Sequence, residues 1–417
     1  MSTETAGFGP CRSCRSPLTT TVVDLGVQPI ADDFPTPEQA ATGEPAFPLH
    51  VLVCTGCWLV QLSHFDGAAQ ILAEHTHASS SYSDTLLAHG AAWATAMIER
   101  FGLSAESLVL EPECNDGYLL GNFVAAGVGA LGLDHVPANV AAANSRGVPA
   151  QVGRLDVTTA HRLAAHGRLA DLVIGNHNLA NSGDLRETAD ATRAVLAPGG
   201  RAAFEFHHVL SLLEGSQFDV VSHSHCCYLS LLALQRPLAD AGLVLVDAEL
   251  VDVHGGSVRA YAALADERPT VEPGVEAVLA VERAAGLDGL DAYRGFGERV
   301  EQVRKGLLEF LDRVEAEGAS IVAYGAPAKG NTLLNACGIT SDRVPWTVDR
   351  SPAKHGRVLP GSHLPIHPPD RILEARPDYV LVLPWSLAGE ITRQLAGVRS
   401  WGGRFVVAMP RVRVLTE

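Results

Sequence analysis

Short apolar runs alternate with amphipathic segments through the middle of the chain, and this alternation predicts a parallel α/β sheet. Residues 86–102 carry an apolar face at helical spacing, and a shorter helix is expected at 138–146. Strand-like apolar runs lie at 108–111, 130–134, 171–174 and, after a turn, within 197–206. Strands that alternate with helices in this way fold into a doubly wound parallel sheet.

A second set of apolar runs predicts another α/β unit towards the C-terminus. Strand-like runs lie at 320–326, 344–349, 378–384 and 404–410, with helices expected at 290–317 and near 385–396. Pro327 follows the first of these runs and favours the first turn of a helix. The exposed N–H groups and the dipole of such a helix start favour a phosphate group.

Four cysteines near the front of the chain form two Cys-x-x-Cys pairs. Cys11 and Cys14 make the first pair, and Cys54 and Cys57 make the second, at the end of a strand-like run at 47–54. Two such pairs supply the four thiolates of a tetrahedral zinc site, which we favour over four unrelated thiols. A site closed by four thiolates has no open position for substrate, so we expect structural zinc that stabilises the module.

Charge and length narrow the class of protein. The chain has 47 acidic and 31 basic residues, for a net charge of -16, and this balance disfavours nucleic acid and anionic membranes as partners. No apolar run reaches the ~18–20 residues of a membrane span, and the first residues lack a signal-peptide pattern. We therefore expect a cytoplasmic protein with a small-molecule substrate. Its 417 residues predict two or three domains.

Polar residues at the ends of the predicted central strands form a candidate ligand site. Ligands of doubly wound sheets bind beyond the carboxyl ends of the strands. Glu111 ends the first strand, Asn115 and Gly117 lie in the next turn, Asp134 ends the second strand, and Asn176 follows the third. An acid at the end of the second strand is compatible with a dinucleotide or with S-adenosylmethionine, or with an ordinary strand end. The missing G-x-G-x-x-G disfavours the dinucleotide.

Eight blocks of sequence, spread over nearly the whole chain, carry a family resemblance. They are CRSC (11–14), CTGC (54–57), 115–120, 217–234, 253–261, 324–339, 348–372 and 378–385. In this order they resemble sugar C-methyltransferases that act on nucleotide-linked deoxysugars in antibiotic pathways. The resemblance implies a zinc-binding module (1–70), a class I methyltransferase domain (71–265) and a Rossmann-like C-terminal domain with connecting helices (266–417).

The resemblance also implies a reaction and a base. In this family a histidine removes a proton next to a 4-keto group, and the carbanion attacks the methyl group of S-adenosylmethionine. His225 falls on the base position, at the end of the block Ser222-His223-Ser224-His225. An imidazole suits this step because its ordinary pKa of ~6.5 lies near working pH. The alternative for His225 is a structural histidine.

Three further residues are candidates for contact with the substrate. Lys329 opens the helix after the run at 320–326, where the resemblance favours a diphosphate contact over an ordinary surface lysine. Asn331 belongs to the same block. His254 precedes a tight glycine turn before a strand and is a second candidate for the cleft.

Several positions depart from the family pattern. Glu113 stands where the family has a small residue, and Asn181 where it has a loop histidine. Thr76 and Ala78 stand at the positions of two tyrosines near the substrate. Ser222 and Ser224 replace the tyrosine and the glutamate that flank the base. A serine orients and activates a histidine far less than a carboxylate does. We expect either methylation of a different substrate or, as the main rival, a cyclase, isomerase or lyase that has lost S-adenosylmethionine. A catalytically silent binding partner is the third reading.

Overall fold

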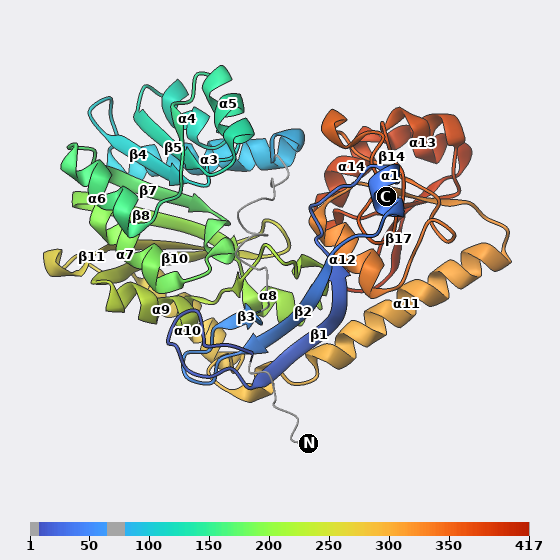
Figure 1. Ribbon diagram of the computed structural model, residues 1–417, viewed down its shortest axis with the longest axis horizontal. Coiled ribbons are helices and arrows are strands. Elements are labelled where there is room, and N and C mark those ends of the chain that lie inside the picture. Colours follow the sequence, from blue (N-terminus) through green and yellow to red (C-terminus); the bar gives the residue numbers. More distant parts are fainter. Residues whose placement is uncertain (1–7, 65–79, 417) are drawn as a thin grey trace.

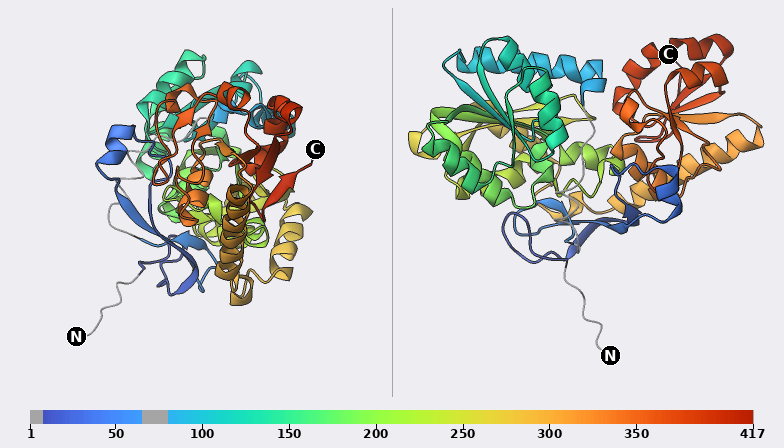
Figure 2. Two further views of the ribbon diagram at one scale, coloured as in Figure 1. Left: turned by 90° about the vertical axis from the view of Figure 1, so that its right-hand side faces the viewer. Right: turned by 45° about the horizontal axis from the view of Figure 1, so that its top comes forward.

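The computed structural model describes residues 8–64 and 80–416, which form three sheets arranged in two lobes (Figure 1). The central lobe is built around a seven-stranded sheet, and the C-terminal lobe around a six-stranded sheet. The N-terminal strands lie beneath both lobes (Figure 2). Thr76 and Ala78 lie outside the described residues. In the part of the chain that is described, no helix has the length and apolar character needed to cross a membrane.

The N-terminal module is a four-stranded sheet with one strand borrowed from the central lobe. Its own strands are β1 (Thr20–Pro29), β2 (Ala46–Val53) and β3 (Val60–Leu62), with the short helix α1 (Pro37–Ala41) between the first two. The fourth strand is β9 (Cys227–Tyr228), which pairs antiparallel with β3. Because β9 begins two residues after His225, the predicted base block is attached to this module.

The central lobe has the expected class I methyltransferase architecture. Its strands, in the order β10-β11-β8-β7-β4-β5-β6, are β10 (Leu243–Val251), β11 (Ser257–Leu264), β8 (Leu196–His207), β7 (Ala170–Asn176), β4 (Leu108–Pro112), β5 (Gly129–Asp134) and β6 (Ala150–Val152). The strands from β8 to β6 are parallel, whereas β11 and β10 form an antiparallel hairpin at one edge. The strand order reverses between β4 and β7, where a ligand crevice is expected.

Helices cover both faces of this sheet. One face packs against α3 (Asp84–Phe101), α4 (Leu120–Ala125) and α5 (Pro137–Ser145), and the other against α6 (Val157–Ala165), α7 (Leu185–Val195), α9 (Leu231–Asp240) and α10 (Pro273–Ala284). Trp93 and Phe123 are fully buried on the first face, as are Ala160 and Leu231 on the second. Burial of a large apolar side chain stabilises the fold by roughly 1.5–3 kcal/mol. The predicted helix at 86–102 is α3, which ends at Gly102 in a left-handed conformation.

The C-terminal lobe is a Rossmann-like sheet, as the sequence predicts. Its strands, in the order β14-β13-β12-β15-β16-β17, are β14 (Ile366–His367), β13 (Thr347–Val348), β12 (Ile321–Tyr324), β15 (Tyr379–Val382), β16 (Arg404–Val407) and β17 (Arg413–Leu415); only β17 is antiparallel among them. Its helices are α12 (Ala328–Ala336), α13 (Asp370–Ala375) and α14 (Ala388–Gln394). The long connector α11 (Phe296–Ala316) begins six residues later than the predicted helix at 290–317.

One apolar core joins the C-terminal lobe to the N-terminal module. This cluster contains Val51 of β2, Leu213 of the short helix α8 (Val209–Glu214), Val303 of α11 and Leu333 of α12. Thr332 of α12 also donates a hydrogen bond of 2.7 Å to the carbonyl oxygen of Val221 in the central lobe. The C-terminal lobe is therefore fixed to the segment that carries the predicted base.

Candidate functional site

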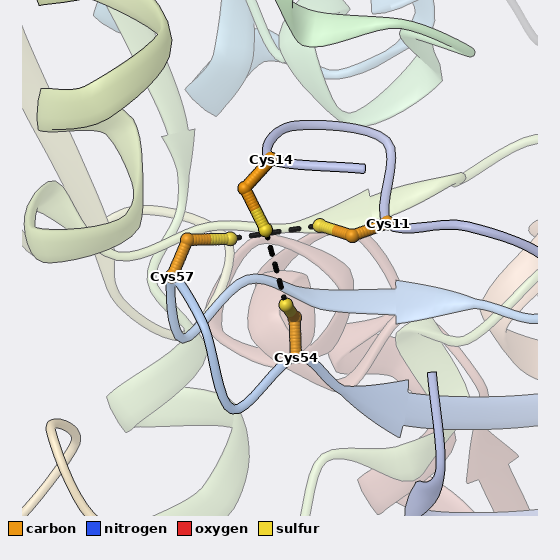
Figure 3. Close-up of side chains that lie close together, drawn as sticks. All are labelled: Cys11, Cys14, Cys54 and Cys57. Carbon is orange, nitrogen blue, oxygen red and sulfur yellow. Dashed lines mark hydrogen bonds between the residues drawn. The ribbon is translucent and has the colours of Figure 1, made fainter. Parts of the chain in front are cut away.

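The four cysteines of the N-terminal module converge on one point (Figure 3). Their Sγ atoms all lie within 4.8 Å of one another. The Sγ–Sγ distance is 3.5 Å between Cys11 and Cys57 and 3.4 Å between Cys14 and Cys54. A tetrahedral zinc ion with four thiolates at about 2.3 Å places the sulfur atoms about 3.8 Å apart. The four side chains therefore fit zinc.

Hydrogen-bond donors surround two of these sulfur atoms. Cys11 Sγ accepts from the backbone N–H of Ser13 at 3.4 Å and from Gln61 Nε2 at 3.2 Å. Cys54 Sγ accepts from the N–H of Gly56 at 3.4 Å. Such donors orient metal ligands and stabilise thiolate charge, so they support the metal site.

The first cysteine knuckle holds the loop that follows β7. The carbonyl oxygen of Arg12 accepts from the N–H of Leu185 at 3.1 Å, and its guanidinium donates to the carbonyl oxygen of Gly183 at 3.3 Å. Arg15 forms an ion pair with Asp184 in the same loop. The zinc module thus fixes the segment next to Asn181.

The turn after β4 has the backbone of a glycine turn but carries larger side chains. Glu113, Asn115 and Gly117 have φ angles of 57°, 55° and 76°. A Cβ atom on Gly117 would lie 3.0 Å from Val148 Cγ1, so this position needs glycine. The Glu113 carboxylate accepts a hydrogen bond of 2.7 Å from the Asn181 amide, across from the end of β7. Two departures from the family pattern therefore touch each other.

Asp134, at the end of β5, holds this turn through hydrogen bonds. Its carboxylate accepts from the N–H of Asn115 at 2.9 Å, from the N–H of Val136 at 2.8 Å and from the Asn139 amide at 3.3 Å. Its side chain is buried, so the carboxylate shapes the turn. The expected contact between Asp134 and a ribose stays a prediction.

Glu111 and Asn176 present acceptor atoms without a protein donor in the same region. Burial raises the pKa of the Glu111 carboxyl well above its ordinary value, and its Oε2 has no hydrogen-bond partner among the described residues. The Asn176 amide donates to the Tyr118 hydroxyl, and its Oδ1 likewise lacks a partner among those residues. Buried acceptors of this kind suit a ligand that brings its own donors or positive charge.

The predicted base has a defined tautomer. The Nδ1 of His225 lies 3.0 Å from the carbonyl oxygen of Val220, which can only accept. Nδ1 therefore carries the proton of the neutral ring, and Nε2 carries the basic lone pair. Ser222 and Ser224 do not replace a carboxylate partner, because their hydroxyls bond each other at 3.0 Å.

His223 anchors the same block to the N-terminal module. Its buried ring lies with Nε2 3.1 Å from the carbonyl oxygen of Phe47 in β2. The contact explains why the block tolerates a buried histidine here, and a catalytic part for His223 remains a prediction.

A buried charged cluster at the carboxyl end of β8 was missed by the sequence analysis. The Glu205 carboxylate is fully buried and accepts from Arg259 Nη2 at 2.7 Å and from His89 Nε2 at 2.8 Å. Burial alone would raise the pKa of Glu205, but the bond from His89 and the charge of Arg259 bring this pKa below its ordinary value. The strand-end rule that selected Asp134 could have found Glu205, because both residues lie at the carboxyl end of a parallel strand.

Histidines gather beside this cluster. His177 Nε2 lies 3.8 Å from Glu205, and its ring makes an edge contact with His254 at a centroid distance of 4.6 Å. Burial, followed by neighbouring positive charges, lowers the pKa of His177 to about 4 and that of His207 to about 3. These rings are therefore neutral at physiological pH, and the predicted role of His254 in the cleft stays a prediction.

Lys329 reaches this group from the C-terminal lobe. Its ammonium lies 5.2 Å from the Trp385 ring centroid, and the Trp385 indole donates to buried Asp219 at 2.6 Å. Its charge also contributes to the lowered pKa of His254, after burial and His177. By contrast, Asn331 is fully buried and donates to the carbonyl oxygen of Ala31 at 2.6 Å, so it joins the lobe to the N-terminal module.

Comparison with known proteins decides the family. The chain matches models described as a putative zinc binding domain (residues 11–71), a methyltransferase domain (88–248) and a C-methyltransferase C-terminal domain (252–410). It is 35% identical over 406 residues to C-methyltransferase NovU from Streptomyces niveus, covering 97% of this chain and 96% of that protein. The chain belongs to the C-methyltransferase family.

Two solved structures that are similar to this chain cover less than half of it. A S-adenosylmethionine-dependent methyltransferase from Clostridium acetobutylicum is 13% identical, with 42% of this chain and 90% of that chain covered and a TM-score of 0.34. The glycopeptide N-methyltransferase MtfA in complex with S-adenosylmethionine is 15% identical, with 42% and 94% covered and a TM-score of 0.33.

A large cavity separates the two lobes of this C-methyltransferase. It has a volume of about 690 Å³ and is lined on one side by Asn115 and Arg146 and on the other by Gly325, Lys354 and Arg357. Ligand pockets commonly measure ~300–1,000 Å³. The first-strand turn of the central lobe and the glycine turn of the C-terminal lobe therefore open into one space.

Proposed function

We propose that this C-methyltransferase uses S-adenosylmethionine to methylate a carbon next to a ketone in a small biosynthetic intermediate. A nucleotide-linked deoxysugar of an antibiotic pathway is the proposed substrate class. The observation that carries the proposal is the fixed tautomer of His225, whose Nδ1 faces the Val220 carbonyl at 3.0 Å. Relationship to a C-methyltransferase along 97% of the chain supports the reaction class.

The turn after β4 and the ends of β5 and β7 are the proposed cofactor contacts. When bound, the cofactor supplies the electrophilic methyl group. Glu111, with an unpartnered buried oxygen, suits the ammonium group of the cofactor, and the backbone of Asn115 and Gly117 lines its path. Asp134 and Asn176 complete the proposed set.

His225 is the proposed general base. Its Nε2 removes the proton next to the ketone, and its Nδ1–H donates to Val220 and stabilises the imidazolium that forms. The Ser222 and Ser224 hydroxyls beside the base bond each other at 3.0 Å.

Lys329 and the cavity between the lobes are the proposed substrate contacts. Lys329 lies at the first turn of α12, so its charge and the helix N–H groups both favour a diphosphate. The cavity of about 690 Å³ offers room for a nucleotide. The zinc ion, bound by the four cysteines, has a structural role in this proposal.

Mass spectrometry of the product tests the proposal. The enzyme is incubated with S-adenosylmethionine and a nucleoside-diphosphate 4-keto-6-deoxysugar, and a gain of one methylene that vanishes in His225→Ala is the expected result. A product of unchanged mass would instead indicate an isomerase or cyclase. Absence of cofactor binding at millimolar concentration in calorimetry, with sugar-nucleotide binding retained, would favour a silent binding partner.

A further inference from the structure

The turn after β4 and the loop after β7 meet over the reversal point of the central sheet. β4 and β7 are neighbours, and their following helices lie on opposite faces of the sheet. Leu120 of α4 belongs to the core of one face, and Leu185 of α7 to the core of the other. The two connections therefore diverge and leave the crevice in which doubly wound sheets bind ligands.

Glu113 and Asn181 bridge this crevice. Glu113 is the first residue after β4, and Asn181 ends the short 3₁₀ helix Asn178–Asn181 that follows β7. The hydrogen bond of 2.7 Å between them fixes the direction of the carboxylate. The left-handed φ of 57° at Glu113 is a strained conformation for a residue with a long side chain, so the position must be held by its surroundings.

Glu113 also lies near the base block. The charge of its carboxylate contributes, after burial, to the raised pKa of the Cys226 thiol, which directly follows His225 in the chain. Methyl transfer requires the sulfonium group to lie between the cofactor turn and the carbon that His225 deprotonates. Glu113 belongs to that turn, and its carboxylate is directed to Asn181 at the end of the loop after β7.

We propose that the Glu113 carboxylate, oriented by Asn181, binds the positively charged sulfonium end of the cofactor and makes the site selective for S-adenosylmethionine over S-adenosylhomocysteine. This inference rests on the proposed function. The two ligands differ by one methyl group and one positive charge. A carboxylate in a partly dry site attracts the charged ligand and gives no such advantage to the neutral thioether. Transfer of the methyl group removes the charge, so the same carboxylate favours product release.

Calorimetric titration with each of the two ligands tests the selectivity. Glu113→Gln keeps an oxygen acceptor for Asn181 and removes the charge. We expect this variant to raise the Kd for S-adenosylmethionine about tenfold, which is on the order of one favourable charge contact. The Kd for S-adenosylhomocysteine should stay within about twofold of the wild-type value. Glu106→Gln is the matched control, because Glu106 is exposed at the opposite end of β4. It should change neither affinity.

Two further variants sharpen the result. Asn181→Ala removes the hydrogen bond that orients the Glu113 carboxylate but keeps its charge. The preference for S-adenosylmethionine over S-adenosylhomocysteine should therefore fall less than in Glu113→Gln. Glu113→Gly restores the small residue of the family turn. Tighter binding of both ligands by Glu113→Gly would show that the side chain blocks the pocket, and would overturn the proposal.

If Glu113→Gln lowered the affinity for both ligands equally, the proposed selectivity would also be overturned, because the carboxylate would then contact a group that both ligands have. Wild-type protein that binds neither ligand would refute the proposed function along with this inference. Binding of both ligands with unchanged selectivity would refute the inference alone. Thermal denaturation of each variant confirms that the fold is intact.

Discussion

Glu390 of the C-terminal lobe accepts a hydrogen bond of 2.9 Å from the hydroxyl of Ser83, the residue that caps α3 in the central lobe. The same carboxylate accepts from the backbone N–H of Thr85 at 3.0 Å. A helix start favours negative charge because its first N–H groups lack helical partners. A carboxylate from one lobe thus completes the helix cap of the other, beside the cavity between them.

Loss of this contact should loosen the two lobes. Glu390→Ala is expected to cost about 0.5–2 kcal/mol in the free energy of unfolding, the range for a lost helix cap, with Glu390→Gln costing less. Urea denaturation measures both values. The contacts of Glu390 lower its pKa against the opposing effect of burial, so its stabilisation is present above the ordinary carboxyl pKa and is lost as pH falls through the folded value. An identical loss at pH 3 and pH 7 would contradict this account.

Zinc removal should unfold the N-terminal module and disorder the site. The first knuckle holds residues 183–185 through Arg12 and Arg15, so Cys54→Ser or a strong chelator should lower the melting temperature and abolish activity. Elemental analysis should give one zinc per wild-type chain and far less in the variant. Cys337→Ser, at the buried cysteine that directly follows α12 and is distant in sequence from the cluster, is the control and should keep full zinc content.

Replacement of the base should affect turnover and spare cofactor affinity. His225→Ala is expected to reduce kcat by roughly 10²–10⁴, the usual contribution of a general base. The Kd for S-adenosylmethionine should stay within a factor of about two, since His225 contacts the substrate in this mechanism. His161→Ala, on the exposed side of α6, provides the comparison. Equal turnover by the His225 and His161 variants would exclude His225 as the base.

The buried histidines should make the fold acid-sensitive. Burial lowers the pKa of His207 to about 3, whereas an unfolded histidine titrates near ~6.5. At a pH below the pKa of the unfolded state, His207 is protonated in the unfolded chain and neutral in the folded one. The free energy of unfolding therefore falls as pH drops from about 6.5 towards the pKa of the folded state. His207→Gln should lose less stability between pH 7 and pH 5 than wild type, by urea denaturation. Equal losses would indicate that His207 does not carry the effect.

Local patterns predicted the architecture and the convergence of the four cysteines. The cysteine pairs recur at a fixed short spacing, and the apolar strands of the central sheet are long enough to be recognised without a partner. Asp134 and Glu111 were selected as candidates by their place at strand ends, and their contact with a ligand stays a prediction. These signals all lie within a few residues of chain.

Contacts between distant segments could not be predicted in the same way. The pairing of Glu113 with Asn181 joins residues 68 positions apart, and the cap of α3 by Glu390 joins residues more than 300 apart. Neither contact leaves a periodic trace in the sequence. The strand β9 has only two residues, too few for a pattern, and it gains its conformation from β3.

The β3–β9 pairing has a consequence for protein engineering. The strand β9, which follows His225, belongs to the sheet of the N-terminal module. The position of the base block therefore depends on that module. A chimaera that swaps the central domain between relatives at its nominal borders would split this unit. Hybrid enzymes should instead exchange residues 8–64 together with 222–228, so that the graft carries both halves of the joint.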